Sequence, residues 1–172
     1  MGRKKAIAQE IPHLRRYARA LLRESAEADD LVQDCIERAL ARLHQWRDRD
    51  SPRQWLFTIM HNLHVDEVRK RQRQASSPAL TIIDGDPLAE KPRQQLHLEA
   101  RDVLAALHAL PDERREALVL VGVEGLNYRD AAAVLGIPVG TLTSRLARGR
   151  EQLRAMLDGD GLPAANIRSL KP

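Results

Sequence analysis

The chain has 172 residues, of which 43% are hydrophobic, so it can form one medium domain or two small ones and is not wholly disordered. Aromatic residues make up only 3%, so a core must consist of Leu, Ala, Val and Ile, and the absence of clean alternating runs favours an all-α protein. The net charge of +4 originates in residues 1–75, which hold 16 Lys and Arg against 11 Asp and Glu, and this is modest evidence for a polyanionic partner.

Two amphipathic helices are predicted at the start of the chain. The first covers residues 11–24 and needs no role beyond the core. The second begins after Ser25, where acidic residues suit the positive end of the helix dipole. Its buried side follows helical spacing and comprises Leu31, Val32, Cys35, Ile36, Ala39, Leu40 and Leu43.

The opposite side of this second helix carries an acidic stripe. Its members are spaced i, i+3, i+4 and i+7, and they are Asp30, Gln33, Asp34 and Glu37. Solvation explains such a stripe in most proteins. Because the surrounding region is basic, the alternative is a docking edge for a basic surface of a partner.

A third helix is predicted from about Arg53, after a polar loop over residues 45–52. Asn62, Asp66, Arg69 and Arg73 fall at i, i+4, i+7 and i+11, which places them on one face that leads into a basic run including Lys70. Such a ridge can hold a base edge and its phosphates, or it can be a solvated helix end. We expect Asp66 to orient Arg69 or Arg71 rather than to contact a polyanion.

Other side chains in this region are candidates for stacking or metal binding. Trp46 and Trp55 are the available stacking groups, and burial is expected for Trp55. His61 and His64 stand three residues apart, but without a third ligand nearby they do not predict a metal site. We expect neither a metal nor a cofactor.

A change in composition divides the chain into two helical domains. Residues 75–97 contain three prolines and a glycine without a sustained helical period, which predicts a flexible linker. The expected units are therefore a domain over residues 1–74, a second domain over residues 98–158 and a tail over residues 159–172.

The second domain contains a predicted helix-turn-helix. A short helix over residues 128–135 ends at Gly136, a residue suited to the left-handed conformation, and Pro138 precedes a second helix over residues 139–156. One stripe of that helix is apolar, comprising Val139, Leu142, Leu146, Leu153 and Leu157. Polar and basic residues lie elsewhere and face solvent or a groove of nucleic acid, namely Thr141, Thr143, Ser144, Arg145 and Arg148.

The sequence contains no signal for export. Cys35 is the only cysteine and lies on an apolar helix face, which predicts an inert buried thiol. No apolar stretch approaches the roughly 20 residues that span a membrane, and no signal-peptide core follows the basic start of the chain. We therefore expect a cytoplasmic protein without membrane insertion.

Three segments in order carry a family resemblance. The acidic helix DDLVQDCIERAL, the Trp-led helix WLFTIMHNLHVDEVRKRQR and the helix-turn-helix LNYRDAAAVLGIPVGTLTSRLARGREQLR resemble bacterial extracytoplasmic-function sigma factors over residues 10–156. The resemblance implies a dissociable subunit of RNA polymerase. Its first domain would melt and read the promoter −10 element, its second would read the −35 element, and an anti-sigma protein would control it.

The resemblance also implies roles for particular residues. Asp30, Gln33, Asp34 and Glu37 correspond to the contact with the clamp helices of the largest polymerase subunit. The −10 element would be met by the loop and the third helix, through Trp46, Arg47, Arg49, His61, Asn62, Arg69, Lys70 and Arg73. Thr141, Thr143, Ser144, Arg145 and Arg148 correspond to the −35 reading helix, in which Thr143 stands where the family often has Lys or Arg.

Three alternatives have distinguishing features. A sigma-mimicking adaptor that binds an anti-sigma protein normally carries a receiver domain, for which 172 residues leave no room. A stand-alone helix-turn-helix repressor should have a dimerisation helix or ligand domain in place of the acidic and Trp-led helices. An enzyme is disfavoured because the sequence has no nucleophile motif, Gly-rich phosphate loop or metal cluster.

Overall fold

The computed structural model describes residues 2–46, 51–75 and 96–159, with the backbone alone for Ala75 and residues 96–99. All elements in these ranges are helical, which confirms the all-α prediction. In chain order they are α1 (Arg3–Leu21), α2 (Ser25–Ala41), α3 (Pro52–Ala75), α4 (Leu96–Ala109), α5 (Asp112–Leu118), the π-helix η1 (Val119–Val123), α6 (Tyr128–Leu135) and α7 (Val139–Gly159).

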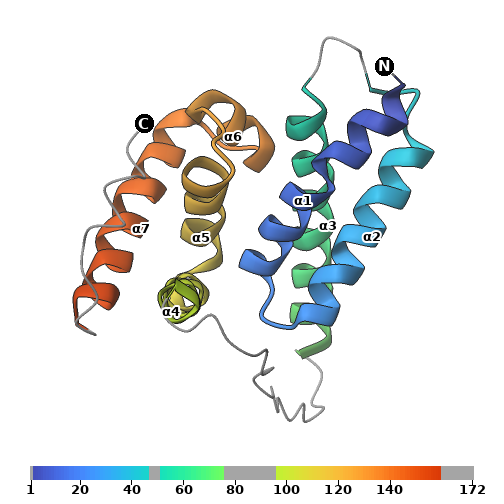
Figure 1. Ribbon diagram of the computed structural model, residues 1–172. Coiled ribbons are helices and arrows are strands. Elements are labelled where there is room, and N and C mark those ends of the chain that lie inside the picture. The colour runs from blue at the N-terminus through green and yellow to red at the C-terminus, as the bar shows by residue number, and fades with distance from the viewer. Residues whose placement is uncertain (1, 47–50, 76–95, 160–172) are drawn as a thin grey trace.

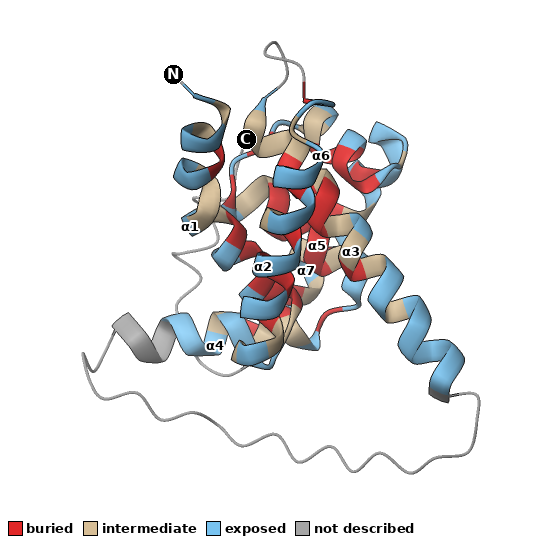
Figure 2. Cartoon of the chain, turned by 90° about the vertical axis from the view of Figure 1, so that its right-hand side faces the viewer, coloured by how far each residue is buried: buried red, intermediate tan, exposed pale blue. Residues whose placement is uncertain are grey.

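The helices form two groups that pack on each other. Figure 1 shows α1, α2 and α3 together on one side and α4 to α7 on the other. Besides packing within its own group, α3 contacts α6, and α1 contacts α4, α5 and η1. The buried apolar residues form one cluster that draws on both groups, and Figure 2 shows buried positions through the middle of the body.

The first helix begins at Arg3, eight residues before the predicted start, and contains Pro12 in its interior. The predicted start at residue 11 would instead have placed Pro12 in the first turn. The turns before it are helical because Ile7 is buried in the core. The missing N–H of Pro12 leaves the carbonyl of Ala8 without its helical donor, but Ala8 is exposed, so water can satisfy it.

The core of α2 follows the predicted pattern with one exception. Cys35 is buried, as predicted, and its thiol donates to the carbonyl of Leu56 at 3.5 Å. Burial raises the pKa of the Cys35 thiol to about 12, which keeps it protonated and inert. The prediction for Leu40 is wrong, because it is 43% exposed: it follows buried Ala39 by one position, about 100° around the helix, and α2 ends one residue later.

A buried arginine joins α4 to α5. Arg115 donates to the carbonyls of His108 (3.4 Å) and Leu110 (3.3 Å), which lie at the end of α4. Its other terminal nitrogen donates to Asp112 Oδ1 at 2.6 Å. Because helix C-termini leave carbonyls without intrahelical donors, this guanidinium both satisfies them and fixes the angle between the two helices.

The predicted helix-turn-helix is confirmed in α6 and α7. Asn127 caps α6 by accepting from the backbone N–H of Asp130 at 2.9 Å, and Gly136 adopts φ 63°, the left-handed conformation expected of it. Leu142 and Leu146 are buried as predicted. Val139 is 45% exposed and was wrongly placed in the core stripe, because the first residue of α7 lies beyond the surface that α5 and α6 cover.

A close approach of α5 and α7 occurs at Gly149. A Cβ at this position would lie 3.0 Å from Leu118 Cδ1 and 3.4 Å from Arg114 Cβ. We predict that Gly149→Val lowers the free energy of unfolding by about 1–3 kcal/mol, because it overpacks a buried contact. Urea unfolding measures this, and Gly140→Ala is the matched control: with no atom within 4 Å, it should be neutral or gain up to about 1 kcal/mol.

Candidate functional site

The acidic stripe of α2 is on the surface, as the sequence predicts. Asp30, Gln33, Asp34 and Glu37 are all exposed. Gln33 Nε2 donates to Glu37 Oε1 at 3.0 Å, which orders two of the four side chains along the helix. The structure therefore presents three carboxylates and one amide together on one open helix face.

A groove of about 410 Å³ lies beside this stripe, between α2 and α3. Its less polar wall consists of Leu22, Leu31, Leu63 and His64. Charged side chains of both signs line the rest of it, namely Glu27, Asp30, Asp34, Arg38, Asp66, Glu67, Lys70 and Arg71. The groove can accept a partner helix that carries an apolar ridge with charges on either side.

The basic end of α3 extends beyond the body of the protein, as Figure 2 shows, and Arg69, Lys70 and Arg73 are exposed there. Arg71, the other arginine of this basic run, forms ion pairs with Glu27 at 2.8 Å and with Glu67 at 3.4 Å. Among the described contacts, Asp66 pairs with neither Arg69 nor Arg71, so the expectation that it orients one of them is wrong.

The neighbours His61 and Asn62 lie in different environments on α3. Asn62 is exposed. His61 is largely covered, and its Nδ1 lies 3.1 Å from Glu116 Oε2 on α5. The structure therefore leaves Asn62 open to a ligand and turns His61 toward the C-terminal helices.

The tryptophans are arranged differently from the prediction. Trp46 is only 6% exposed and stacks on Trp55, with ring centroids 5.8 Å apart and planes 14° apart. The Arg3 guanidinium carbon lies 6.0 Å from the centre of the Trp46 ring. Trp55 is the more accessible of the two, so the prediction that Trp46 offers an open stacking face is wrong. Arg47 and Arg49, the loop candidates, lie outside the described residues.

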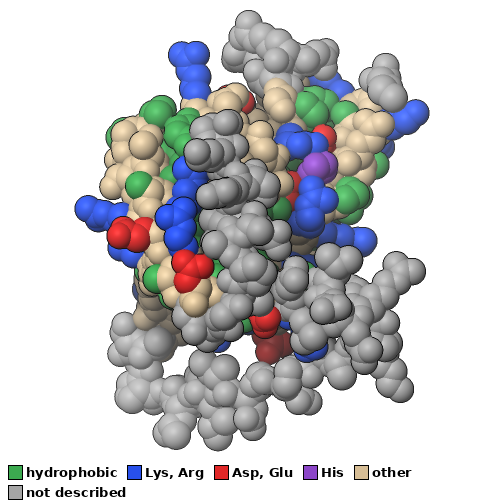
Figure 3. All heavy atoms as spheres, turned by 60° about the vertical axis from the view of Figure 1, so that its left-hand side comes forward, with side chains coloured by type: hydrophobic (Ala, Val, Ile, Leu, Met, Phe, Trp, Pro, Cys, Tyr) green, Lys and Arg blue, Asp and Glu red, His purple; other side chains and the backbone are tan. Residues whose placement is uncertain are grey.

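The N-terminal half of α7 displays most of its predicted reading residues. Thr141, Thr143, Ser144 and Arg148 are exposed. Thr143 Oγ1 donates to the carbonyl of Val139 at 3.0 Å, and Arg145 pairs with exposed Glu113 of α5 at 3.1 Å. Figure 3 shows Lys and Arg side chains over the face on this side of the molecule, with acidic side chains among them.

His64 is a buried titratable group beside the groove. Burial lowers its pKa, an effect that Arg115 and His61 reinforce and that Glu116 and Asp112 oppose. Because the folded protein disfavours the imidazolium, the stability that neutral His64 contributes is fully present above pH 6.5 and is lost as the pH falls toward its lowered folded pKa.

We predict that His64→Gln weakens the fall in melting temperature between pH 7.5 and pH 5.5. The wild-type protein should lose stability over this range, and the variant should lose less because it has no proton to gain at this position. Thermal unfolding followed by circular dichroism measures both. A variant that is as acid-sensitive as the wild-type protein contradicts the assignment.

The described part of the chain has neither a metal-binding cluster nor a membrane-spanning helix. There, no group of three or more His, Cys, Asp or Glu residues is arranged to hold a metal ion. Within the same ranges, no helix combines the length and apolar character needed to cross a bilayer.

Comparison with known proteins assigns the chain to a family. Residues 7–61 match the sigma2 domain of PhyR, and residues 100–153 match sigma-70 region 4. An ECF RNA polymerase sigma factor, EcfG of Rhodopseudomonas palustris (strain TIE-1), is 42% identical over 90% of this chain and 84% of its own length. The chain belongs to the extracytoplasmic-function sigma factors. It is thus an RNA polymerase sigma factor, which directs the polymerase to promoters and starts transcription there.

Two solved structures share this fold. The sigma factor RpoE of Bartonella quintana, in complex with the anti-sigma factor NepR, is similar with a TM-score of 0.81 and 33% identity, over 90% of this chain and 96% of that one. CnrH, in complex with the cytosolic domain of CnrY, has a TM-score of 0.67 and 29% identity, over 91% and 87% of the two chains.

The residues that join the two groups of helices were not predicted from the sequence. Glu116 and Glu124 are only 5% and 3% exposed, and both lie against residues of α1 or α3. The available signal was their position, since Glu124 interrupts the apolar run VLVGVEG. A carboxylate at such a place requires a buried partner, but the sequence does not say which one.

Proposed function

We propose that this sigma factor binds core polymerase through the acidic stripe of α2. The observation that carries the proposal is that Asp30, Gln33, Asp34 and Glu37 are exposed together beside a groove with an apolar wall. Clamp helices with basic residues would meet the carboxylates, while an apolar ridge would enter the groove. Charge complementarity of this kind sets both specificity and the rate of association.

Contact with the −10 element is proposed for α3. Asn62 would hold an extruded base by hydrogen bonds, which offset an unstacking cost of a few kcal/mol. Arg69, Lys70 and Arg73 would neutralise phosphates along the exposed end of the helix. Arg47 and Arg49 stay candidates from the sequence, and His61 would need to leave Glu116 before it could contribute.

Contact with the −35 element is proposed for the exposed face of α7. Its first turns would enter the major groove, where Arg148 is open to reach a base or a phosphate. Thr141, Thr143 and Ser144 offer hydroxyl groups to the same groove. Arg145 would first have to exchange its pairing with Glu113 for a contact with DNA.

Further proposals concern the domain organisation, cellular location and regulation of the protein. We propose that residues 1–74 and 98–158 act as two domains joined by residues 75–97, that the protein works in the cytoplasm, and that it has no catalytic activity of its own. An anti-sigma factor is proposed as its regulator, with support from the similar sigma factor RpoE, whose structure was solved in complex with the anti-sigma factor NepR.

A second candidate function is that of an adaptor that sequesters an anti-sigma factor. The match of residues 7–61 to the sigma2 domain of PhyR favours it. An adaptor of this kind would bind the anti-sigma factor without supporting transcription. The adaptor and the sigma factor therefore differ in one measurable result, which is whether the protein supports transcription by core polymerase.

Transcription in vitro with purified core polymerase and a promoter library tests both. We expect initiation from a defined subset of promoters, and weak binding of the free protein to duplex DNA, because each reading element is small and polymerase must fix their separation. Absence of initiation together with anti-sigma binding would support the adaptor. Tight binding of the free protein to one palindromic operator would support a repressor instead.

A further inference from the structure

The two groups of helices are joined by a buried carboxylate. The Glu124 side chain has no exposed surface, and the hydrogen bonds described for it cross to α1. Its Oε1 accepts from Arg16 Nε at 3.1 Å and its Oε2 from Arg16 Nη2 at 3.1 Å, while His13 Nδ1 lies 2.7 Å from Oε2. This is a bidentate arginine–carboxylate contact with an imidazole beside it; the carboxylate is closed off from water, whereas the Arg16 side chain is 50% exposed.

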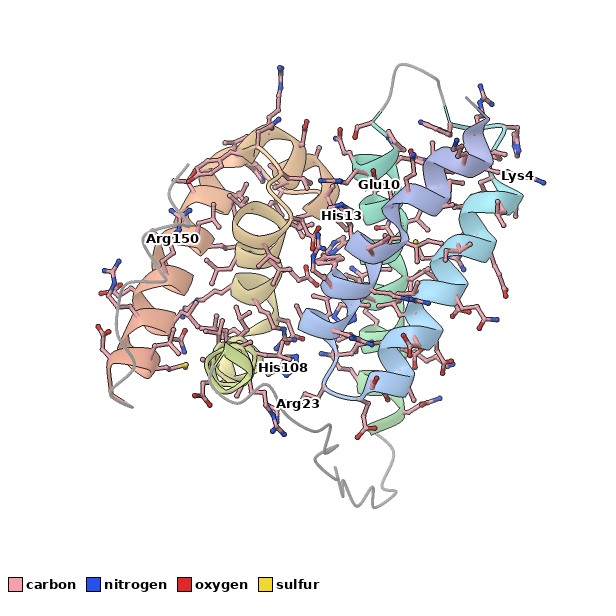
Figure 4. The ribbon with its side chains drawn as sticks, viewed as in Figure 1. Lys4, Glu10, His13, Arg23, His108 and Arg150 are labelled. Carbon is pink, nitrogen blue, oxygen red and sulfur yellow. The ribbon has the colours of Figure 1, made fainter. Side chains whose placement is uncertain are left out.

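A second arginine contacts the other nitrogen of the His13 ring. Arg53 Nη2 lies 2.7 Å from His13 Nε2, and Arg53 Nε donates to Glu10 at 2.7 Å. Because a guanidinium only donates, Nε2 accepts from Arg53, whereas Nδ1 lies between Glu124 Oε2 at 2.7 Å and Arg16 Nη2 at 2.6 Å. Figure 4 shows Glu10 and His13 on α1, with His13 at the boundary between the two groups.

Two further sets of contacts lie along the same boundary. The carboxylate of Glu116 on α5 is within 3.1 Å of His61 and 3.7 Å of His64, both on α3. Near the C-terminal end of α1, His108 Nε2 donates to the carbonyl of Arg19 at 3.0 Å, and Arg23 donates to the carbonyl of His108 at 3.2 Å. The boundary is therefore held at several points, and Glu124 is the most completely buried charge among them.

Such a closed body cannot meet both promoter elements at once. The −10 and −35 elements are about 25 base pairs apart, which is about 85 Å along B-form DNA. A compact chain with this number of described residues has a radius of gyration of about 14 Å and is roughly 40 Å across. The helices that would read the two elements, α3 and α7, must therefore separate.

We propose that, before it meets polymerase, this sigma factor rests in the closed arrangement, latched by Glu124 between His13 and Arg16, and that the latch opens before both promoter elements are engaged. The inference rests on the proposed function for its consequence in transcription, but the latch itself can be tested without DNA. Closure also holds His61 against Glu116, so opening releases a residue of the α3 face.

Distance measurement by pulsed electron paramagnetic resonance tests the latch in the full chain. Spin labels at Ala41→Cys on α2 and Ala155→Cys on α7 occupy exposed positions on opposite groups. The native Cys35 stays unlabelled because it is buried and its pKa is raised to about 12. We expect one narrow distribution of short distances for the wild-type latch.

Glu124→Arg should shift the distances to a broad, longer distribution. In the closed arrangement it places a buried cation against Arg16, whereas in the open one it returns to water. The charge swap Arg16→Glu with Glu124→Arg should restore the short distances, and Glu151→Arg on exposed α7 is the matched control that should change nothing. Circular dichroism verifies that each variant remains helical.

Three outcomes overturn the latch: a wild-type protein that is already open, a Glu124→Arg variant that stays closed, and a charge swap that stays open while helical. Affinity for core polymerase provides a second readout. If about 90% of the free protein is closed, opening should tighten the apparent Kd about tenfold. If Glu124→Arg opens the protein but no promoter-specific transcription occurs, the latch stands and the proposed function is refuted. If the protein supports promoter-specific transcription but Glu124→Arg leaves the spin-label distances unchanged, the proposed function stands and the latch is refuted.

Discussion

Asp30→Arg combined with Asp34→Arg should abolish association with core polymerase and leave the fold intact. Both side chains are exposed, and they point away from the buried Leu31 and Cys35. Each reversal should therefore change the free energy of unfolding by no more than about 0.5 kcal/mol. At the interface, each would turn an attraction to basic clamp residues into a repulsion.

Co-purification with core polymerase and gel filtration measure this effect. The matched control is Glu151→Arg with Asp158→Arg, which reverses two exposed acidic residues on α7 and should still bind core. If the α2 double variant co-elutes with polymerase at wild-type affinity, the stripe is not part of the interface.

The two DNA-reading elements should fail in different ways when they are altered. Asn62→Ala should impair strand opening at the −10 element and leave formation of the closed promoter complex almost unchanged, because a base pocket acts only after the base leaves the stack. Arg148→Ala should weaken initial binding at −35. It should flatten the salt dependence if Arg148 contacts a phosphate, or relax sequence choice by about 1–3 kcal/mol at one base pair if it contacts a base.

Permanganate footprinting of unpaired thymines and salt-titrated binding to holoenzyme distinguish these results. Gln74→Ala on α3 and Arg154→Ala on α7 are exposed controls on the same helices. Normal opening by Asn62→Ala together with wild-type −35 affinity of Arg148→Ala would leave the family assignment in place and remove both residues from the DNA interface.

Features set by neighbouring residues could be predicted from the sequence. The helix-turn-helix is one, because the left-handed Gly136 and the start of α7 after Pro138 depend only on residues within a turn or two. The acidic stripe is another, since helical spacing alone places its four members on one side of α2. The exposure of these four side chains in the structure agrees with that spacing.

Features set by distant residues could not be predicted in the same way. Pro12 lies inside α1 because Ile7 gains enough burial to extend the helix backward, and a local proline rule does not include that gain. Trp46 is buried because Trp55 and Arg3 come to it from elsewhere in the fold. The partners of Glu124 are 108 and 111 positions away in sequence, beyond the range of any periodic pattern.

The widened turn of η1 determines where the last of these residues points. In an uninterrupted α-helix, positions 116 and 124 would differ by about 80° in direction. The wider π-helix turn, in which the N–H of Glu124 bonds the carbonyl of Val119 at 2.9 Å, lessens that difference and brings both glutamates toward α1 and α3. Closure of this sigma factor therefore depends on helix phase as well as on charge: if Val119–Val123 formed a regular α-helical turn at the same length, the two carboxylates would point about 80° apart although every side chain of the contact was still present.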